Sequence, residues 1–313
     1  MAMLFMADGW DADPWRAAFA AEAPHVDLRI WPDQGNAEDV DYALVWSPPQ
    51  GALARFGSLK AIVSLAAGVD HLLADPTLPD VPILRLVDPQ ISMRMSEYVV
   101  HNVLLHHRQF LALAQAQREK RWEVLRQPAA SEVRVGVMGL GALGMDAARK
   151  LTLLGFAVAG WSRSAKAIEG LETYAGREAL DPFLRRTDIL VCLLPLTPDT
   201  AGILNADTFA RLARRPGLAG PVLINAGRGG LHVERDILAA LDDGTLHGAS
   251  LDVFETEPLP GDSRLWTHPR VVISPHMASD PGQRDLVRNI LAQIRRIEEG
   301  LPLSCLVDRS VGY

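Results

Sequence analysis

Three side chains able to bind an anion or transfer a proton follow runs of residues that are typical of buried strands. Arg228, Glu257 and His276 each come shortly after a run rich in valine, isoleucine or leucine. In a parallel sheet the carboxyl ends of the strands meet at one edge, and ligands bind beyond that edge. We therefore expect the three side chains to converge on one catalytic site.

An arginine, a carboxylate and a histidine suit the reversible reduction of a 2-keto acid. His276 can protonate the carbonyl oxygen as a hydride reaches the carbon, and Glu257 would stabilise the imidazolium. Arg228 can hold the substrate carboxylate and polarise its carbonyl. Each residue also has an alternative role without catalysis. His276 could be structural, Glu257 could cap its loop, and Arg228 could bind only cofactor phosphate.

A glycine pattern upstream predicts a site for a dinucleotide. An apolar run at 133–138 leads into Gly139-x-Gly141-x-x-Gly144, and apolar residues at helical spacing follow at 142–154. Glycine at these positions permits a tight turn, close approach of the backbone to a phosphate, and packing of helix on strand. The expected cofactor contacts of this turn are Gly139, Leu140, Gly141, Ala142, Leu143 and Gly144.

The residues after the next predicted strand indicate which dinucleotide is preferred. An NAD site usually has a carboxylate at this place, which binds the ribose 2′-hydroxyl. This chain instead has Trp161, Ser162, Arg163 and Ser164. A guanidinium and two hydroxyls suit a 2′-phosphate, so we expect NADP(H) to be preferred over NAD(H). The alternative is that Arg163 is a solvated surface side chain.

The pattern of the whole chain predicts an α/β fold of two doubly wound parallel-sheet domains. We expect a Rossmann cofactor domain at 98–282, inserted in a flavodoxin-like substrate domain at 1–97 and 283–313. One long helix is expected from Ser92, its candidate cap, to about Arg126. A final amphipathic helix is expected at 281–299. The predicted strands are 3–7, 42–46, 61–65, 83–86, 133–138, 156–161, 189–194, 222–226, 248–253 and 271–274.

The amino-acid composition limits the kinds of molecule that the protein can bind. The 313 residues are 48% hydrophobic and carry a formal net charge of −7, which argues against nucleic acid or an anionic membrane as the main partner. No apolar run approaches the length of a transmembrane helix, and the first residues lack the basic stretch of a signal peptide. Cys192 and Cys305 lie far apart in apolar surroundings, which fits reduced thiols in the cytoplasm.

A metal centre built from histidines is disfavoured. His101, His106 and His107 do not give an i, i+4 pair with a third ligand, and no pair of cysteines compensates. We expect no bound metal, and we expect these histidines to lie on the surface of the long helix or at an interface.

Four segments resemble signature segments of the D-isomer-specific 2-hydroxyacid dehydrogenases. They are 194–200, 222–230, 251–260 and 274–276, and the resemblance extends over essentially the whole chain. Within the family the chain is most similar to the glyoxylate/hydroxypyruvate reductase A group, through Trp161 to Ser164 and through the start of the long helix. The segment Met95 to Tyr98 departs from the Ala-Glu-His type of many members, so contacts made there are not carried over.

The resemblance implies roles for individual residues. It implies that Arg228 binds substrate, that His276 donates the proton, and that Glu257 orients this histidine. It also implies that Asp252 holds the nicotinamide amide. Further cofactor contacts are implied for Leu194, Pro195, Thr200, Ala226 and Gly227. The backbone amides of Ala67, Gly68 and Val69 are implied to bind the substrate carboxylate. Trp46 either forms a wall of the substrate pocket or is a core side chain. Asp70 and His71 are expected to cap the following helix.

The resemblance further implies a homodimer and a small 2-keto acid substrate. Arg121 and Trp122 resemble the arm through which family dimers embrace, although a contact of Trp122 within its own chain is an open alternative. A second function on the same fold is a dinucleotide-sensing interaction protein. The complete set of Arg228, Glu257 and His276 favours an enzyme.

Overall fold

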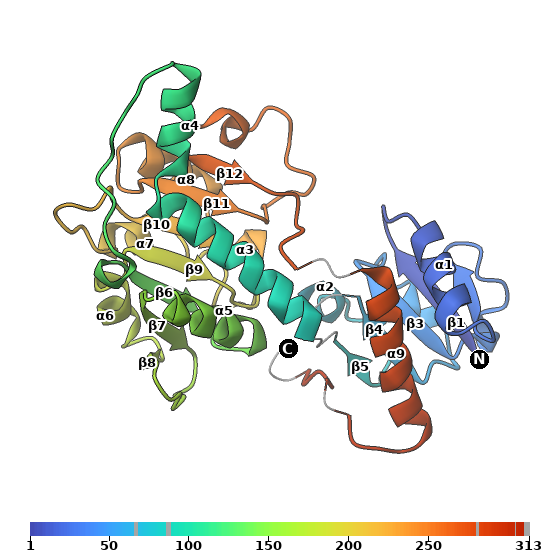
Figure 1. The fold of residues 1–313 in the computed structure, drawn as a ribbon. Helices are drawn as coiled ribbons and strands as arrows, with labels where there is room; N and C mark the ends of the chain where they lie inside the picture. The colour runs from blue at the N-terminus through green and yellow to red at the C-terminus, as the bar shows by residue number, and fades with distance from the viewer. Residues whose placement is uncertain (66–67, 86–88, 280–281, 304, 310–313) are drawn as a thin grey trace. The chain divides into compact units, whose positions relative to one another are not determined.

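The chain forms two compact units (Figure 1). The computed structural model describes all residues except 66–67, 86–88, 280–281, 304 and 310–313. Unit 1 consists of Met1–Pro89 and Pro281–Tyr313, and unit 2 consists of Gln90–Asp280. The second unit is therefore an insertion in the chain of the first.

Unit 1 contains a five-stranded parallel sheet in the order β2-β1-β3-β4-β5, which is the flavodoxin-like order. Helices α1 (Asp13–Glu22) and α9 (Gln283–Glu298) pack on each other, and Glu22 of α1 accepts a hydrogen bond from Arg288 Nε of α9 at 2.9 Å. The strands are β1 (Ala2–Ala7), β2 (Asp27–Ile30), β3 (Tyr42–Trp46), β4 (Ala61–Ser64) and β5 (Ile83–Leu84).

Unit 2 contains a seven-stranded parallel sheet in the order β12-β11-β10-β9-β6-β7-β8. This is the Rossmann strand order with one added strand, and it confirms the predicted α/β fold. The strands are β6 (Arg134–Met138), β7 (Ala157–Ser162), β8 (Glu172–Ala175), β9 (Ile189–Cys192), β10 (Val222–Asn225), β11 (Gly248–Leu251) and β12 (Val271–Ile273). The helices are α3 (Pro89–His107), α4 (Phe110–Arg118), α5 (Ala142–Leu153), α6 (Leu180–Arg185), α7 (Ala206–Arg211) and α8 (Glu234–Asp242).

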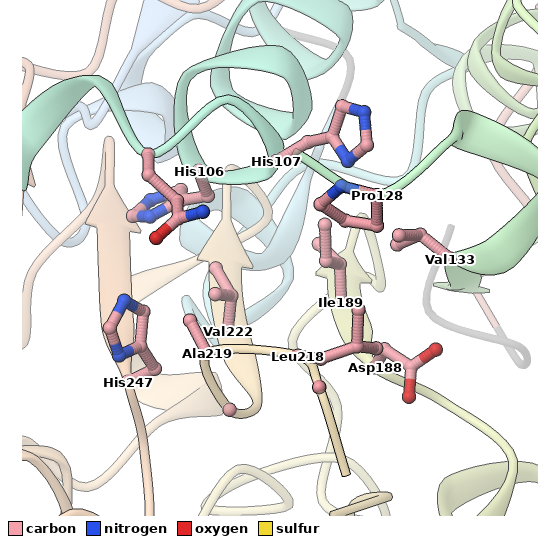
Figure 2. A pocket seen from close by; sticks show the side chains of 13 residues that line it. His106, His107, Pro128, Val133, Asp188, Ile189, Leu218, Ala219, Val222 and His247 are labelled. Atoms are coloured by element: carbon pink, nitrogen blue, oxygen red, sulfur yellow. The ribbon is translucent and has the colours of Figure 1, made fainter. Parts of the chain in front are cut away.

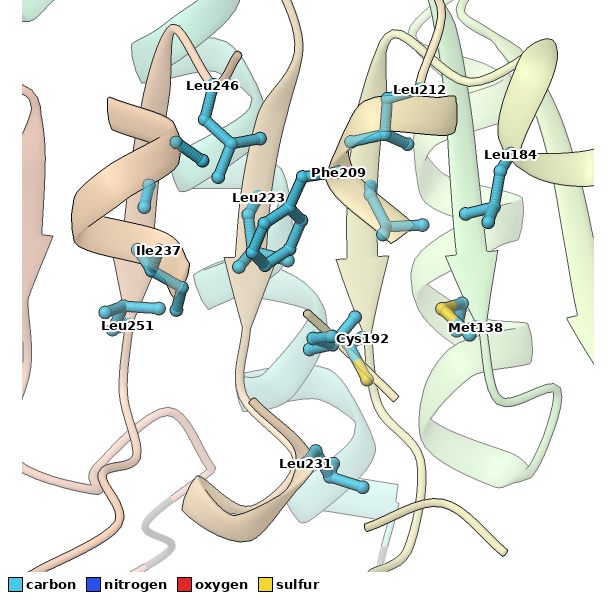
Figure 3. Close-up of a cluster of buried hydrophobic side chains, with 14 of the residues drawn as sticks. Met138, Leu184, Cys192, Phe209, Leu212, Leu223, Leu231, Ile237, Leu246 and Leu251 are labelled. Atoms are coloured by element: carbon cyan, nitrogen blue, oxygen red, sulfur yellow. The ribbon is translucent and has the colours of Figure 1, made fainter. Parts of the chain in front are cut away.

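Two apolar layers hold the helices of unit 2 on the sheet. One layer joins α6, α7 and α8 to one face, where Leu184, Phe209 and Ile237 point toward the strands (Figure 3). The other layer joins α3 and α5 to the opposite face. Because each fully buried aliphatic or aromatic side chain contributes roughly 1.5–3 kcal/mol, these layers fix the strand ends on which the site is built.

The prediction of one long helix from Ser92 to about Arg126 is wrong, because the chain forms two helices, α3 and α4. Gln109 has a φ of +54°, a left-handed conformation that ends α3 before α4 begins. Hydrogen bonds to the returning chain stabilise this break, from Arg108 Nε to Gln127 Oε1 at 2.7 Å and from Gln109 Nε2 to the carbonyl of Arg126 at 2.6 Å. Ser92 lies inside α3 and does not cap it, and residues 121–129 contain neither helix nor strand.

Strands β2 and β8 were not predicted. Both are edge strands, and none of their residues is fully buried. A strand that faces solvent lacks the apolar run on which the other strands were recognised. The last predicted helix is confirmed as α9, which is two residues shorter at its start and one shorter at its end.

His106 is not at the surface, contrary to expectation. It lies buried at the end of α3, and its Nε2 is 2.9 Å from the hydroxyl of Ser250 on β11. Burial and the charge of His247 lower the pKa of His106 to about 4. This histidine therefore joins α3 to the sheet as a neutral group, whereas His101 is exposed.

No helix in the described part of the chain combines the length and the apolar character that crossing a membrane would require.

Candidate active site

The glycine turn between β6 and α5 depends on glycine at two positions for its own packing. Gly139 has a φ of +99°, and a Cβ atom there would lie 2.7 Å from the carbonyl oxygen of Leu193. A Cβ atom on Gly144 would lie 1.8 Å from the carbonyl oxygen of Gly139. Side chains at these positions would separate β6 from β9 or lift α5 from its strand.

Gly141 differs from these two glycines, because the space beside it is open. It is the N-cap of the 12-residue helix α5, and an added Cβ atom would meet nothing within 4 Å. The open space therefore lies where the first amides of a helix and its positive dipole end can receive a phosphate. Ala142 is exposed and Leu143 half-exposed beside it, whereas the side chain of Leu140 is buried against Gly160. The turn fits a pyrophosphate.

The last two residues of β7 are buried, and the two residues that follow the strand are exposed. Trp161 is buried and donates from its indole nitrogen to the carbonyl of Gly176 at 2.9 Å. Ser162 is also buried, and its hydroxyl donates to the carbonyl of Ser164 at 2.8 Å. The side chains of Arg163 and Ser164 are exposed. The guanidinium group of Arg163 is thus exposed to solvent, where a charged ligand can reach it.

Lys166 is a second cation at this place, and sequence reasoning missed it. Its ammonium group donates to the carbonyl oxygen of Leu140 at 2.6 Å, so it lies against the glycine turn. The signal in the sequence was a second basic residue three positions after Arg163. Only the fold shows that the side chain turns back toward the turn.

The turn that carries Arg228 is held by side-chain bonds and by close packing. Asn225 accepts from the amide of Gly227 at 3.0 Å and donates to the carbonyl of Arg228 at 3.1 Å. A Cβ atom on Gly229 would lie 1.7 Å from the carbonyl oxygen of Phe254. The arginine turn and the acidic loop are therefore adjacent.

Glu257 and His276 form a hydrogen-bonded pair. The distance from Glu257 Oε2 to His276 Nδ1 is 2.8 Å, and Glu257 Oε1 accepts from the amide of Phe254 at 3.0 Å. Because an ionised carboxylate only accepts, the proton of the neutral ring lies on Nδ1 and the acid–base role falls to Nε2. The structure thus brings Glu257 into contact with His276, as the sequence predicted.

The charge of Glu257 is maintained by its neighbours. Burial acts to raise the pKa of Glu257, but the hydrogen bonds from His276 and Phe254 and the charges of His276 and Arg228 lower it below its ordinary value. The carboxyl group is therefore ionised near neutral pH and stabilises a positive charge on the imidazole.

Asp252 is buried beneath the loop that carries the histidine. One carboxylate oxygen accepts from the hydroxyl of Ser274 at 2.6 Å and from the amide of Met277 at 3.0 Å, and the other accepts from the amide of Ala278 at 2.9 Å. Burial raises the pKa of Asp252, although these three hydrogen bonds oppose the effect. The carboxylate organises the loop in addition to any contact with a cofactor.

The other implied cofactor contacts surround the same strand ends. Thr200 donates to the carbonyl of Pro195 at 2.7 Å, which closes the loop after β9 on itself. Leu194 and Ala226 are buried, and a Cβ atom on Gly227 would lie 2.8 Å from the carbonyl oxygen of Leu194. These segments could therefore contact a cofactor through backbone groups and small apolar side chains, not through charged side chains.

In unit 1, Trp46 lies at the carboxyl end of β3. Its ring centroid is 4.9 Å from that of His71 and 5.8 Å from that of Trp10. The hydroxyl of Ser64 donates to the carbonyl of Gly68 at 3.2 Å, which holds the turn before α2 (Asp70–Leu73).

The capping role expected for Asp70 and His71 is wrong, because the N-cap of α2 is Val69 and both residues lie inside the helix. Ala67 falls outside the described residues.

A cavity of about 50 Å³ in unit 2 lies at the opposite edge of the sheet (Figure 2). Its lining includes His247, which precedes β11, and Ile189 and Val222, which begin β9 and β10. These are the amino ends of the strands, and the volume is far too small for a nucleotide. The cavity is therefore separate from the candidate active site.

Trp122 projects from the segment after α4 and is 99% exposed. The alternative that Trp122 packs against its own chain is therefore wrong. Val124 in the same segment is 88% exposed, and Phe110 at the start of α4 is 58% exposed. The predicted arm therefore exposes two large apolar side chains, Trp122 and Val124.

Comparison with known proteins agrees with this geometry. Residues 100–278 match the family model described as D-isomer specific 2-hydroxyacid dehydrogenase, NAD binding domain. The glyoxylate/hydroxypyruvate reductase A of Serratia proteamaculans is 40% identical over 319 residues, which cover 100% of both chains. The NADPH-dependent glyoxylate/hydroxypyruvate reductase of Sinorhizobium meliloti, in complex with NADP and sulfate, is 47% identical with a TM-score of 0.94, over 100% of this chain and 99% of that one. A D-isomer specific 2-hydroxyacid dehydrogenase of Xanthobacter autotrophicus, in complex with NADPH and MES, is 44% identical with a TM-score of 0.92, over the same shares.

Proposed function

Because the chain belongs to the D-isomer specific 2-hydroxyacid dehydrogenase family, we propose that it reduces small 2-keto acids such as glyoxylate and hydroxypyruvate to 2-hydroxy acids with NADPH. The observation that carries the proposal is the 2.8 Å contact between Glu257 and His276. The reductase names of the relatives favour this activity over the dinucleotide-sensing interaction protein.

The side chains divide the chemistry between them. His276 donates the proton from Nε2 to the carbonyl oxygen of the keto acid, while Glu257 holds Nδ1 and stabilises the positive charge of the ring. Arg228 binds the substrate carboxylate and polarises the carbonyl. Bound NADPH supplies the hydride. Substrate contacts of Trp46, Gly68 and Val69 remain part of the proposal.

The cofactor would be held by unit 2 (Gln90–Asp280), which contains most of the cofactor domain predicted at 98–282. Amides at the start of α5 bind the pyrophosphate, and the open space at Gly141 leaves room for it. Arg163 and Lys166 bind the 2′-phosphate, because no carboxylate at this place repels it and two cations attract it.

The proposed activity predicts that purified protein oxidises NADPH faster when glyoxylate or hydroxypyruvate is added. A His276→Gln variant should lose about a hundredfold or more in kcat, because it cannot donate the proton, while it still binds NADPH. Stopped-flow absorbance measures the rate and fluorescence titration measures the binding. A wild-type protein that binds NADPH but shows no keto-acid-dependent oxidation would contradict the proposal and leave the dinucleotide sensor.

The proposed phosphate site predicts a change in cofactor preference. Replacing Arg163 and Lys166 together by alanine should raise the KM for NADPH roughly tenfold or more, because charge-assisted hydrogen bonds to phosphate are lost, with the KM for NADH nearly unchanged. Arg185→Ala is the matched control, since this arginine is exposed on α6 and pairs with Asp181. An equal rise in KM for NADPH and NADH, or no change in either KM, would show that Arg163 and Lys166 do not bind the 2′-phosphate.

We also propose that the protein is a homodimer in which the arm of one subunit packs on the other. The exposed Trp122 and Val124 of the arm, with Phe110 at the start of α4, support this proposal, because packing large apolar side chains on a second subunit removes their surface from water. A cytoplasmic location remains part of the proposal; Cys192 and Cys305 are both buried free thiols.

The dimer proposal predicts that replacing Trp122 and Val124 by serine shifts the protein toward monomers, because the buried apolar area is lost. Sedimentation velocity over a range of concentrations measures the dissociation constant. Leu153→Ser is the control, since Leu153 is 86% exposed at the end of α5 and outside the arm. A monomeric wild-type protein, or an unchanged dissociation constant in the variant, would refute the arrangement.

A further inference from the structure

Ser274 connects helix α3 to the carboxylate beneath the histidine loop. Its hydroxyl oxygen lies 3.0 Å from the phenolic oxygen of Tyr98 on α3 and 2.6 Å from Oδ1 of Asp252. Asp252 directly follows β11, and Ser274 directly follows β12. The network therefore joins helix α3 to the carboxyl ends of these two strands.

The direction of the two hydrogen bonds follows from the number of protons. An ionised carboxylate only accepts, so Ser274 donates its single hydroxyl proton to Asp252. The serine oxygen can then only accept from Tyr98, whose phenol is the donor. Burial raises the pKa of Tyr98 above its ordinary value, so the phenol keeps its proton at working pH. The chain of donors thus runs from Tyr98 through Ser274 to Asp252.

Asp252 in turn holds the backbone on both sides of the histidine side chain. Its carboxylate accepts from the amides of Met277 and Ala278, and its carbonyl accepts from the amide of His276 at 2.7 Å. His276 has a φ of +54°, a left-handed conformation that is unfavourable for a non-glycine residue. Such a conformation persists only where surrounding bonds hold it. The bonds to Asp252 are among those that hold it, together with the bond from the His276 amide to the carbonyl of Ser274 at 3.1 Å and the contact with Glu257.

We propose that Tyr98 and Ser274 are positioning residues for His276, which act by fixing the carboxylate of Asp252 and through it the loop 276–278. The proposal rests on the proposed function, because His276 is the proton donor of that reaction. Neither residue needs to touch substrate or cofactor. A hydroxyl removed from either one releases the carboxylate, and the imidazole then loses its alignment with Glu257.

The test uses Tyr98→Phe, which removes one oxygen atom, together with Ser274→Ala and Ser274→Thr in the full-length protein. We expect kcat with glyoxylate to fall roughly three- to tenfold in Tyr98→Phe and further in Ser274→Ala, with recovery in Ser274→Thr, which keeps the donor. The amide resonances of Met277 and Ala278 in a nitrogen-15 correlation spectrum should shift in the first two variants, because these amides donate to Asp252. Tyr42→Phe is the control, since Tyr42 is a buried tyrosine at the amino end of β3, and it should change neither quantity.

Unchanged amide resonances of Met277 and Ala278 in both Tyr98→Phe and Ser274→Ala would overturn the inference, whatever the rate. Shifted resonances with a lower kcat in these variants and recovery in Ser274→Thr would support it. A wild-type protein without keto-acid reduction would show instead that the proposed function is wrong. In that case the amide resonances still decide whether the network positions the loop.

Discussion

The hydrogen bond between Glu257 Oε2 and His276 Nδ1 is the interaction on which the account depends. It sets which ring nitrogen exchanges a proton, and it places a negative charge where the imidazolium needs one. The neighbouring Arg228 helps to keep that charge by lowering the pKa of Glu257. In the proposed reaction, binding of a carboxylate substrate and protonation of its carbonyl would therefore depend on the same three charged side chains.

The architecture of unit 2 serves to bring loops from separate strands within contact distance. Gly139 and Gly229 permit backbone approaches that a Cβ atom would prevent, and these approaches join the loops after β6 and β9 and those after β10 and β11. The buried carboxylate of Asp252 then fixes the loop after β12. The site is thus held mainly by backbone packing and by a buried hydrogen-bond network, which suits a geometry that must be exact for proton transfer.

The proximity of Arg228, Glu257 and His276 could be predicted from the sequence because each follows an apolar run, and in a parallel sheet such positions share one edge. Lys166 and Ser274 could not be assigned, since their contacts join residues far apart in sequence. The break at Gln109 was missed for a similar reason: local helix propensity is overridden by side-chain bonds to a segment that returns from α4. The ligand contacts of Arg163 and Trp46 remain predictions.

The most direct test of the central claim is the pH dependence of keto-acid reduction by the wild-type protein and by Glu257→Gln, at saturating NADPH. Glutamine keeps the size of the side chain but removes the charge that stabilises the protonated histidine. The account predicts that kcat falls roughly ten- to a hundredfold, and that the pH above which the rate declines moves to a lower value. Equal kcat values with superimposable pH profiles would contradict it.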